Sequence, residues 1–252
     1  MMGYVVKGSE GEVVVIDGGR KEDAPFLRSF LLEHGGIVKR WLITHPHKDH
    51  IGALSILLKE PGGITIQTLY GAFLDESVME KCDPNRLNEF LMLRDSIRES
   101  GVPFVWVTAG RSLDTSGIKI DVLSGVNPEI LQNCMNNSSI VYKLVDDNKS
   151  ALFLGDLGVE GGEKLLRSSL SQYLESDYVQ MAHHGQRGVG FNVYKRISPK
   201  VCLWPTPLWL WDNDNGGGYN SGPWDTLRVR RWMDEINVKK HYIMADGLSE
   251  IH

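Results

Sequence analysis

Short strand-like runs alternate with amphipathic helical segments along almost the whole chain, and this alternation most restricts the folds that the chain can adopt. Residues 12–16 form a β-branched run that is closed by Asp17-Gly18-Gly19, and residues 23–33 carry apolar side chains at helical spacing. Some neighbouring strands are joined by short turns, whereas others are separated by helices. This mixture predicts sheets with both local and crossover pairing, and therefore an α/β (α+β) fold.

The same patterns give the expected elements. We expect strands at residues 12–16, 38–44, 64–70, 102–107, 118–123, 139–145, 151–154, 177–181, 200–204 and 241–245, and helices at residues 23–33, 50–60, 86–99, 159–170 and 225–236. Neither a repeat nor a linker divides them, so we expect one domain over residues 1–252. Residues 204–224 hold four of the seven tryptophans in a long loop, and such loops are often functional.

Composition excludes several classes of protein. Hydrophobic residues make up 42% and charged residues 23%, which are globular values, so a disordered or fibrous chain is excluded. The net charge of -5 excludes the broad cationic surface that dominates duplex-DNA binding. Apolar runs fall far short of the roughly 20 residues of a membrane helix, and no signal-peptide pattern opens the chain. We expect a soluble, cytoplasmic protein without membrane insertion; the oligomeric state is left open.

The three cysteines are widely spaced. Cys82, Cys134 and Cys202 form no Cys-x-x-Cys pair, so we expect neither a disulfide framework nor a zinc ribbon. The sequence predicts three unlinked thiols that are buried or half-buried.

Five of the eight histidines fall in two short clusters. The first cluster, Thr44-His45-Pro46-His47-Lys48-Asp49-His50, lies where a predicted strand ends and a helix begins. His45 and His47 are two residues apart, so they project to the same side of an extended segment. Three imidazoles and one carboxylate within six residues are costly to bury without a cation. Nitrogen and oxygen ligands of this kind suit Zn²⁺, Mn²⁺ or Fe²⁺.

Two further motifs follow strands in the second half of the chain. Gly155-Asp156 follows the predicted strand at residues 151–154, and His183-His184-Gly185 follows the strand at residues 177–181. Alone, Gly155-Asp156 is an ordinary strand-ending turn, and a lone histidine after a strand is more often structural. A pair of histidines placed in this order is more often linked to a metal.

These motifs resemble those of the metallo-β-lactamase fold superfamily. His45-x-His47-x-Asp49-His50 is similar to its signature motif, and Asp17-Gly18-Gly19 is similar to a first motif whose Asp supports the metal cluster. Gly155-Asp156 resembles the motif whose Asp bridges two metals. The resemblance implies an αββα four-layer sandwich with the metal site at one edge of the sheets.

A narrower resemblance rests on the segment Asn136-Asn137-Ser138-Ser139 together with His183-His184-Gly185. It is similar to the hydrolase domain of the ComEC family of DNA-uptake channel proteins. In such domains the Asn/Ser segment stands where β-lactamases and lactonases carry another histidine, which argues against antibiotic hydrolysis. The family's opening strand is expected to be absent or abbreviated before Glu12.

The resemblance implies two divalent ions, with Zn²⁺ as the first choice and Mn²⁺ or Fe²⁺ as alternatives. They would share and activate a water molecule. The implied ligands of one ion are His45, His47 and Asp156, and those of the other are Asp49, His50, His183 and Asp156.

The other implied site residues have supporting roles. Asp17 would orient a ligand by hydrogen bonding. His184 has three open interpretations: it replaces His183 as a ligand, protonates a leaving group, or only packs. Asn136, Asn137 and Ser139 would donate hydrogen bonds to a substrate, or alternatively serve in caps and turns.

The function implied is that of a metal-dependent hydrolase acting on a phosphodiester or a nucleic-acid-related substrate. Hydrolysis of a small ester, thioester or lactone is the alternative, followed by a non-catalytic metal-binding role. A diiron redox enzyme is disfavoured, because such enzymes typically carry Glu where His47 stands and a fused flavin domain.

The expected partner is a small molecule or a single-stranded nucleic acid. Residues 183–252 hold nine Lys/Arg against seven Asp/Glu. Arg228, Arg230 and Arg231 are placed to meet phosphates, and tryptophans of the long loop are placed to stack on bases. The alternative is a solvated helix face with core aromatics.

Overall fold

The buried run Val-Val-Val-Ile at residues 13–16 shows how the chain is layered. It lies in strand β2 (Val13–Asp17), where successive side chains point to opposite faces of the sheet. The first and third valines pack under helices α1 (Ala24–Glu33) and α2 (Lys48–Lys59). The second valine and the isoleucine pack against strands of the other sheet. A strand buried on both faces is a continuous apolar run, which explains this segment.

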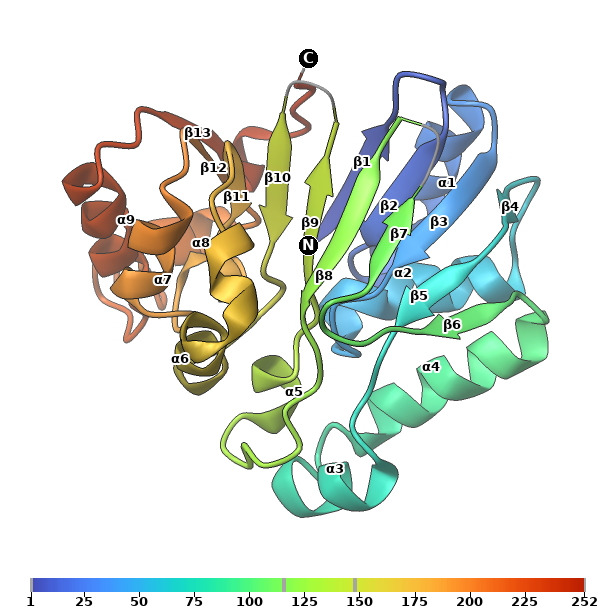
Figure 1. Cartoon of the computed structure of the whole chain (residues 1–252), viewed down its shortest axis with the longest axis horizontal. Coiled ribbons are helices and arrows are strands. Elements are labelled where there is room, and N and C mark those ends of the chain that lie inside the picture. Colours follow the sequence, from blue (N-terminus) through green and yellow to red (C-terminus); the bar gives the residue numbers. More distant parts are fainter. Residues whose placement is uncertain (1, 115–116, 147–148, 252) are drawn as a thin grey trace.

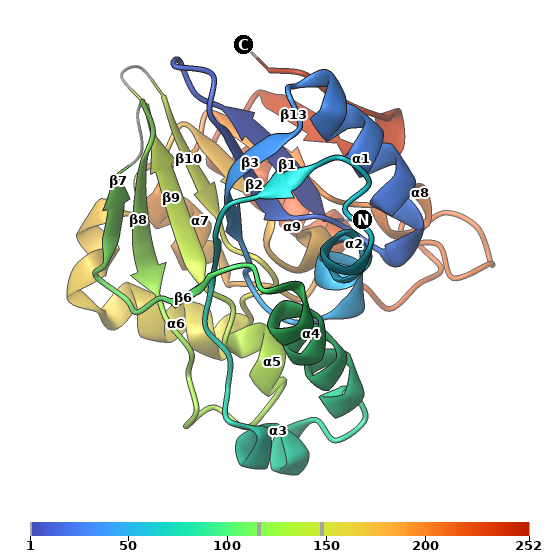
Figure 2. The same cartoon turned by 90° about the vertical axis from the view of Figure 1, so that its right-hand side faces the viewer.

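In the computed structural model, described over residues 2–114, 117–146 and 149–251, two sheets pack face to face. Helices cover the outer side of each sheet (Figures 1 and 2). The predicted mixed α/β sandwich is therefore confirmed, and three apolar layers separate its four structural layers.

The first sheet comes from the N-terminal half and has the strand order β1-β2-β3-β5-β6, with β4 paired to β3. β1 is antiparallel to β2, and the other pairs are parallel. Besides β2, its strands are β1 (Gly3–Lys7), β3 (Ile37–Leu42), β4 (Thr65–Ile66), β5 (Leu69–Gly71) and β6 (Phe104–Trp106).

The second sheet is formed by the strands from residue 112 onward and has the order β13-β12-β11-β10-β9-β8-β7. Strands β7 to β10 pair antiparallel, and β10 to β13 pair parallel. These strands are β7 (Ser112–Asp114), β8 (Lys119–Ser124), β9 (Val141–Val145), β10 (Ser150–Phe153), β11 (Tyr178–Gln180), β12 (Val201–Trp204) and β13 (Lys240–Ile243).

The helices divide between the two outer faces. Residues of α1, α2 and α4 (Leu87–Ser100) pack on the first sheet. Residues of α6 (Val159–Arg167), α7 (Phe191–Ile197) and α9 (Thr226–Glu235) pack on the second. The remaining helices are α3 (Glu76–Cys82), α5 (Cys134–Asn137) and α8 (Leu208–Trp211). Short 3-10 helices span Lys21–Asp23, Ser169–Tyr173, Ala182–Gly185 and Met244–Asp246. Within the described residues, none of the helices combines the length and the apolar character needed to cross a lipid bilayer.

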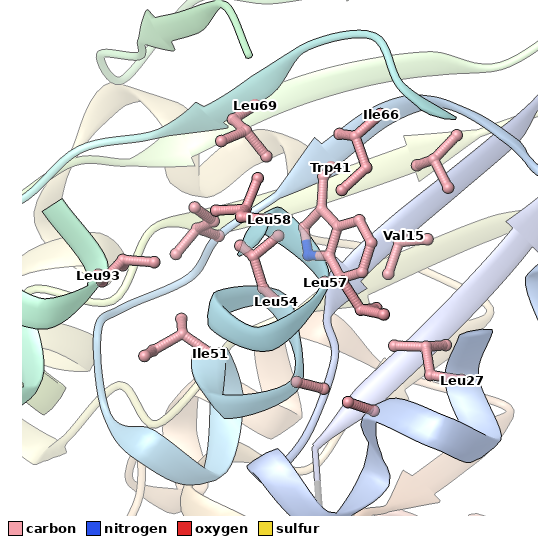
Figure 3. Close-up of a cluster of buried hydrophobic side chains, with 14 of the residues drawn as sticks. Val15, Leu27, Trp41, Ile51, Leu54, Leu57, Leu58, Ile66, Leu69 and Leu93 are labelled. Carbon is pink, nitrogen blue, oxygen red and sulfur yellow. The ribbon is translucent and has the colours of Figure 1, made fainter. Parts of the chain in front are cut away.

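Trp41 lies at the centre of the outer core of the first sheet. Figure 3 shows its indole between the strands and α2, with Leu54 and Leu57 of that helix nearby. Its ring N–H donates to the carbonyl of Asp17, so the same side chain fills the core and holds the end of β2. This buried residue therefore connects core packing with the strand end on which a site residue lies.

Most expected elements are present, and four differences are informative. The strand expected at residues 64–70 is two short strands, β4 and β5, each paired with β3. The long loop at residues 204–224 contains the helical turn α8. Helices α3, α5 and α7 and strand β7 were not expected, because they are short and lack a long periodic pattern. The expectation of an absent or abbreviated opening strand is wrong: β1 pairs with β2 from Gly3↔Asp17 to Lys7↔Val13.

The prediction of three unlinked cysteines is also wrong. Cys82 at the end of α3 and Cys134 at the start of α5 form a disulfide across a sequence separation of 52, with Cα atoms 6.1 Å apart. Cys202 is a buried free thiol, as expected. Widely spaced cysteines give no local sign of pairing, because the pair depends on two helices meeting in space.

Candidate metal centre

The polar motifs meet where parallel strands end. β2 ends at Asp17, β3 leads into His45, β10 leads into Asp156, and β11 leads into the 3-10 helix that contains His184. The carboxyl ends of parallel strands meet at one edge of a sheet, and ligands bind in the crevice outside them. Strand order therefore brings together segments that are far apart in the sequence.

The first ligand group consists of His45, His47 and Asp156, whose ligand atoms all lie within 4.8 Å of one another. His45 Nε2 is 3.0 Å from His47 Nδ1 and 3.8 Å from Asp156 Oδ2. All three side chains are buried. This group is the set implied for one ion.

The second ligand group consists of Asp49, His50 and His184, again within 4.8 Å of one another. His184 Nε2 lies 3.0 Å from Asp49 Oδ2 and 3.7 Å from Asp156 Oδ2. His50 Nε2 lies 3.2 Å from Asp156 Oδ1. Asp156 thus contacts both groups, with one oxygen toward His50 and the other toward His45 and His184.

The two adjacent histidines occupy different positions. His183 Nε2 is 3.9 Å from Asp156 Oδ2 and 3.4 Å from Asn136 Nδ2, and its side chain is 21% exposed. Both residues adopt left-handed backbone conformations, with φ of 50° and 56°, which L-residues rarely adopt. This turn places His184, and not His183, in the second ligand group.

Asp17 lies where a supporting residue is expected. Its carboxylate accepts hydrogen bonds from Thr44 N, Thr44 Oγ1 and His50 Nδ1, each at 2.8 Å. The carboxylate is fully buried. Thr44, which sequence reasoning missed, also contacts His45 Nδ1 through its hydroxyl at 3.1 Å. Asp17 and Thr44 therefore fix the ring orientation of one histidine in each ligand group, namely His50 and His45.

Several buried ligand atoms at the centre make no hydrogen bond. They are His50 Nε2, Asp156 Oδ1 and His184 Nε2. A buried polar atom without a partner costs about 1–3 kcal/mol. Imidazole nitrogens and carboxylate oxygens are ligands for divalent transition metals. The unpartnered atoms therefore fit divalent metal ions, which would satisfy them together.

The electrostatics favour the protonation states that bind metal. Burial opposes ionisation of Asp156, but the nearby His50, His184 and His183 outweigh it and hold its pKa well below the usual value. Burial is likewise outweighed at Asp49, mainly by the nearby side chain of His184, and the pKa is lowered. Burial, assisted by His50 and His47, lowers the pKa of His45 well below its usual value. Ionised carboxylates and neutral imidazole are the forms that act as ligands.

His50 is the exception among these groups. Burial would lower its pKa, but the carboxylates of Asp156 and Asp17 raise it well above the usual value. The two carboxylates therefore favour the protonated form of this imidazole. A metal ion at His50 Nε2 needs the neutral ring and would compete with that proton.

The three expected substrate-binding residues separate in the structure. Asn136 faces His183, and its Oδ1 is buried without a hydrogen bond. Asn137 is fully engaged, because its amide donates to Gln132 O and Glu160 Oε2 and accepts from Gly161 N. Ser139 Oγ accepts from the backbone N–H of Asp156 at 3.1 Å. The contacts of Asn137 and Ser139 match the alternative of cap and turn roles, and Asn136 keeps an amide group directed at His183.

Arginines of helix α9 and tryptophans of the loop at residues 204–224 contact other side chains of the same chain. Arg228 pairs with Asp225 at 2.8 Å. Arg230 lies over Trp211, 4.0 Å from the ring centre, and Trp211 packs edge-on against the buried Trp204. These contacts match the alternative prediction, in which the helix face is solvated and the tryptophans belong to the core.

Comparisons with known proteins agree with the fold and the motifs. A model described as the metallo-β-lactamase superfamily matches residues 3–66. ComE operon protein 3 of Bacillus subtilis is 27% identical over 163 residues, which is 64% of this chain and 19% of that protein. RNase aCSPSF2 of Saccharolobus solfataricus is 22% identical over 210 residues, which is 78% of this chain and 40% of that protein. The chain thus spans less than half the length of either relative.

A solved structure shows the same fold. YhfI, a metallo-β-lactamase fold protein from Bacillus subtilis, has a TM-score of 0.57 at 13% identity, covering 95% of this chain and 87% of that one. The comparisons thus agree with the motif order: residues 3–66 match the metallo-β-lactamase superfamily model, the chain as a whole has the metallo-β-lactamase fold, and much of it is similar to part of ComE operon protein 3.

Proposed function

We propose that this protein hydrolyses a phosphodiester, in a small molecule or in single-stranded nucleic acid. The observation that carries the proposal is the convergence of two His/Asp groups on Asp156. Two neighbouring ligand groups suit this reaction, since a pair of divalent ions, when bound, activates water and stabilises charge on the attacking and leaving oxygens.

The residues proposed to hold the ions are His45, His47 and Asp156 for one, and Asp49, His50 and His184 for the other, with Asp156 reaching both. This assignment exchanges His183 for His184 relative to the sequence-based one. Zn²⁺ is the proposed metal, because the donor set is rich in imidazole, and Mn²⁺ and Fe²⁺ are the alternatives.

The chain's own residues would orient the reacting groups. Asp17 and Thr44 hold His50 and His45 through short hydrogen bonds, so the ligand positions are set before substrate arrives. Asn136 Nδ2 would donate a hydrogen bond to a substrate oxygen. His183, the most exposed of the five clustered histidines, would deliver a proton from Nε2 to the leaving group.

The substrate class rests on three supports. The Asn136 segment stands where β-lactamases carry another histidine, and Asn136 faces the centre. One relative carries the name RNase, and its similarity covers most of this chain. The net charge of -5 weakens capture of a long polyanion, which favours a small phosphodiester or a short single strand over a duplex.

The test compares wild type with Asp156→Ala. In the variant we expect loss of bound metal, measured by elemental analysis. We also expect phosphodiester cleavage to fall by more than about 100-fold, because loss of a partner that only supports a ligand already costs about 10–100-fold in affinity or activity. Asp177→Ala, a matched aspartate in the loop before β11, is the control and should retain both.

The substrate panel contains a chromogenic phosphodiester, single-stranded DNA and RNA, a thioester, a lactone and a β-lactam, each with Zn²⁺ or Mn²⁺. Cleavage of the phosphodiester or of a single strand supports the proposal. Efficient cleavage of the lactone, the thioester or the β-lactam with both phosphodiester substrates left intact would overturn it.

A further inference from the structure

Each histidine of the metal centre has one ring nitrogen that faces the ligand groups and one that points away from them. The histidines differ in the hydrogen-bond partner of the second nitrogen. For His45, His50 and His184, the nitrogen near Asp156 is Nε2. Their Nδ1 atoms contact Thr44 Oγ1 at 3.1 Å, Asp17 Oδ2 at 2.8 Å and the carbonyl of Pro205 at 2.8 Å, respectively. Each of these rings is therefore fixed by a partner on its far side.

His47 has the opposite orientation. Its Nδ1 lies 3.0 Å from His45 Nε2, so this nitrogen faces the ligand group. Its Nε2 is buried and makes no hydrogen bond. A histidine that binds metal almost always donates its other ring N–H to a carboxylate, a carbonyl or water, which sets the tautomer and the ring orientation. His47 thus needs a partner at Nε2.

Asp83 supplies a carboxylate at this position. Its Oδ2 lies 3.9 Å from His47 Nε2, and its side chain is 25% exposed. A movement of about 1 Å brings the pair to hydrogen-bond distance. No sequence motif contains Asp83, because it lies beyond the end of α3, well away from the histidine cluster.

The backbone around Asp83 is held on both sides. The Asp83 N–H donates to Met79 O at 2.8 Å, and Asp83 O accepts from Arg86 N at 3.0 Å. The preceding residue, Cys82, is linked by the disulfide to Cys134, two residues before Asn136. The carboxylate is therefore fixed relative to the helix that carries the proposed substrate-binding amide.

We propose that Asp83 is a positioning residue of the metal centre, whose carboxylate accepts the Nε2–H of His47 and leaves Nδ1 as the ligand nitrogen. This inference rests on the proposed function, because it assumes that the His45–His47–Asp156 group binds a metal ion. A carboxylate partner also raises the basicity of the ligating imidazole, which strengthens metal binding.

The first measurement uses the wild-type protein loaded with Zn²⁺, because without metal His47 Nδ1 lies at hydrogen-bond distance from His45 Nε2 and would donate to it. Long-range ¹H–¹⁵N NMR at pH 8 distinguishes the two imidazole tautomers, and the His47 signals are identified by their loss in His47→Gln. We expect the Nε2–H tautomer. A His47 ring protonated at Nδ1 would overturn the inference, whatever the behaviour of any variant.

The second measurement is the dissociation constant for Zn²⁺, obtained by competition with a chelator. Asp83→Ala should raise the dissociation constant of the more tightly bound Zn²⁺ ion by about 10–100-fold, which is the usual effect of losing a hydrogen-bond partner of a ligand. Asp83→Glu should restore most of the affinity. Glu80→Ala removes an exposed carboxylate from the same helix and should leave the affinity within about twofold of wild type.

Unchanged Zn²⁺ affinity in a folded Asp83→Ala protein would contradict the role of Asp83 while leaving the proposed function intact. A wild-type protein that binds no Zn²⁺, Mn²⁺ or Fe²⁺ would instead remove the proposed function itself. The two failures are therefore distinguishable.

Discussion

The two halves of the molecule supply the metal centre in different ways. The first half contributes four ligand candidates within six residues at one strand–helix junction, from His45 to His50. The second half contributes Asp156, His184 and Asn136 from three separate segments, which follow or precede different strands. The local motif is visible in the sequence. The dispersed residues converge because the parallel strands β10 and β11 end side by side, and because the antiparallel strand β9 begins beside the end of β10.

The backbone dihedral angles of the ligand candidates also differ between the two halves. His47 has an ordinary extended conformation, with φ of -71° and ψ of 143°, at the residue that precedes α2. In the second half, the adjacent His183 and His184 both have positive φ, and in the first half the supporting residue Asp17 does too, with φ of 58°. Backbone strain of this kind persists only where the surrounding structure enforces it, and it concentrates at functional sites. The histidines of the second half thus depend on an enforced turn, whereas the four ligand candidates of the first half do not.

The largest expected effect separates the two adjacent histidines of the second half. His184→Ala should weaken binding of one Zn²⁺ equivalent by more than about 100-fold, since it removes a buried ligand candidate. His183→Ala should change the affinity by less than about tenfold but reduce turnover, because His183 lies at the exposed side of Asp156. Calorimetric titration and steady-state kinetics measure the two effects. The reverse result would return His183 to the ligand set.

A smaller effect is expected where the halves touch. Gly155 has φ of 57°, and an added Cβ would lie 2.8 Å from Thr44 Cβ and 3.0 Å from Ser139 Cβ. Gly155→Ala should lower the free energy of unfolding by about 2–4 kcal/mol, through left-handed strain and overpacking. Urea denaturation measures this. Gly125→Ala, where the added Cβ meets only Ala109 N at an ordinary 3.6 Å, is the control; equal stability of the two variants would show that the junction is not tight.

The smallest effect concerns the end of the second sheet opposite the site. The hydrogen bond from Lys200, followed by those from Ser150, lowers the pKa of Asp177 to about 2, although burial opposes this. Because the pKa is depressed on folding, the stabilisation is present above about pH 4 and is lost as pH falls toward 2. The contribution should be under about 1 kcal/mol, since solvent screens the pair through the largely exposed Lys200.

Acid titration of the free energy of unfolding, in wild type and Asp177→Asn, measures this contribution. The variant should show a flatter dependence between about pH 4 and pH 2 and unchanged metal binding at neutral pH. A steeper dependence in the variant, or loss of metal binding, would show that this end of the sheet is coupled to the site.

The sequence alone determined the layered fold and one half of the site. The run at residues 13–16 is apolar at every position because β2 is buried on both faces, and helical periodicity marked α1, α2 and α4. His45, His47, Asp49 and His50 were found because their spacing within one junction fixes their mutual geometry.

Only the tertiary structure decided the remainder. The choice between His183 and His184 depends on a left-handed turn, which neighbouring residues in sequence do not reveal. Asn136 and Asn137 are adjacent and chemically identical, yet one faces His183 and the other is bonded to Gln132, Glu160 and Gly161. Cys82 meets Cys134, and Asp83 meets His47, because α3 and α5 come together beside the site. Contacts of this kind arise from packing between distant segments, and such packing leaves no periodic or local signal in the residues that make it.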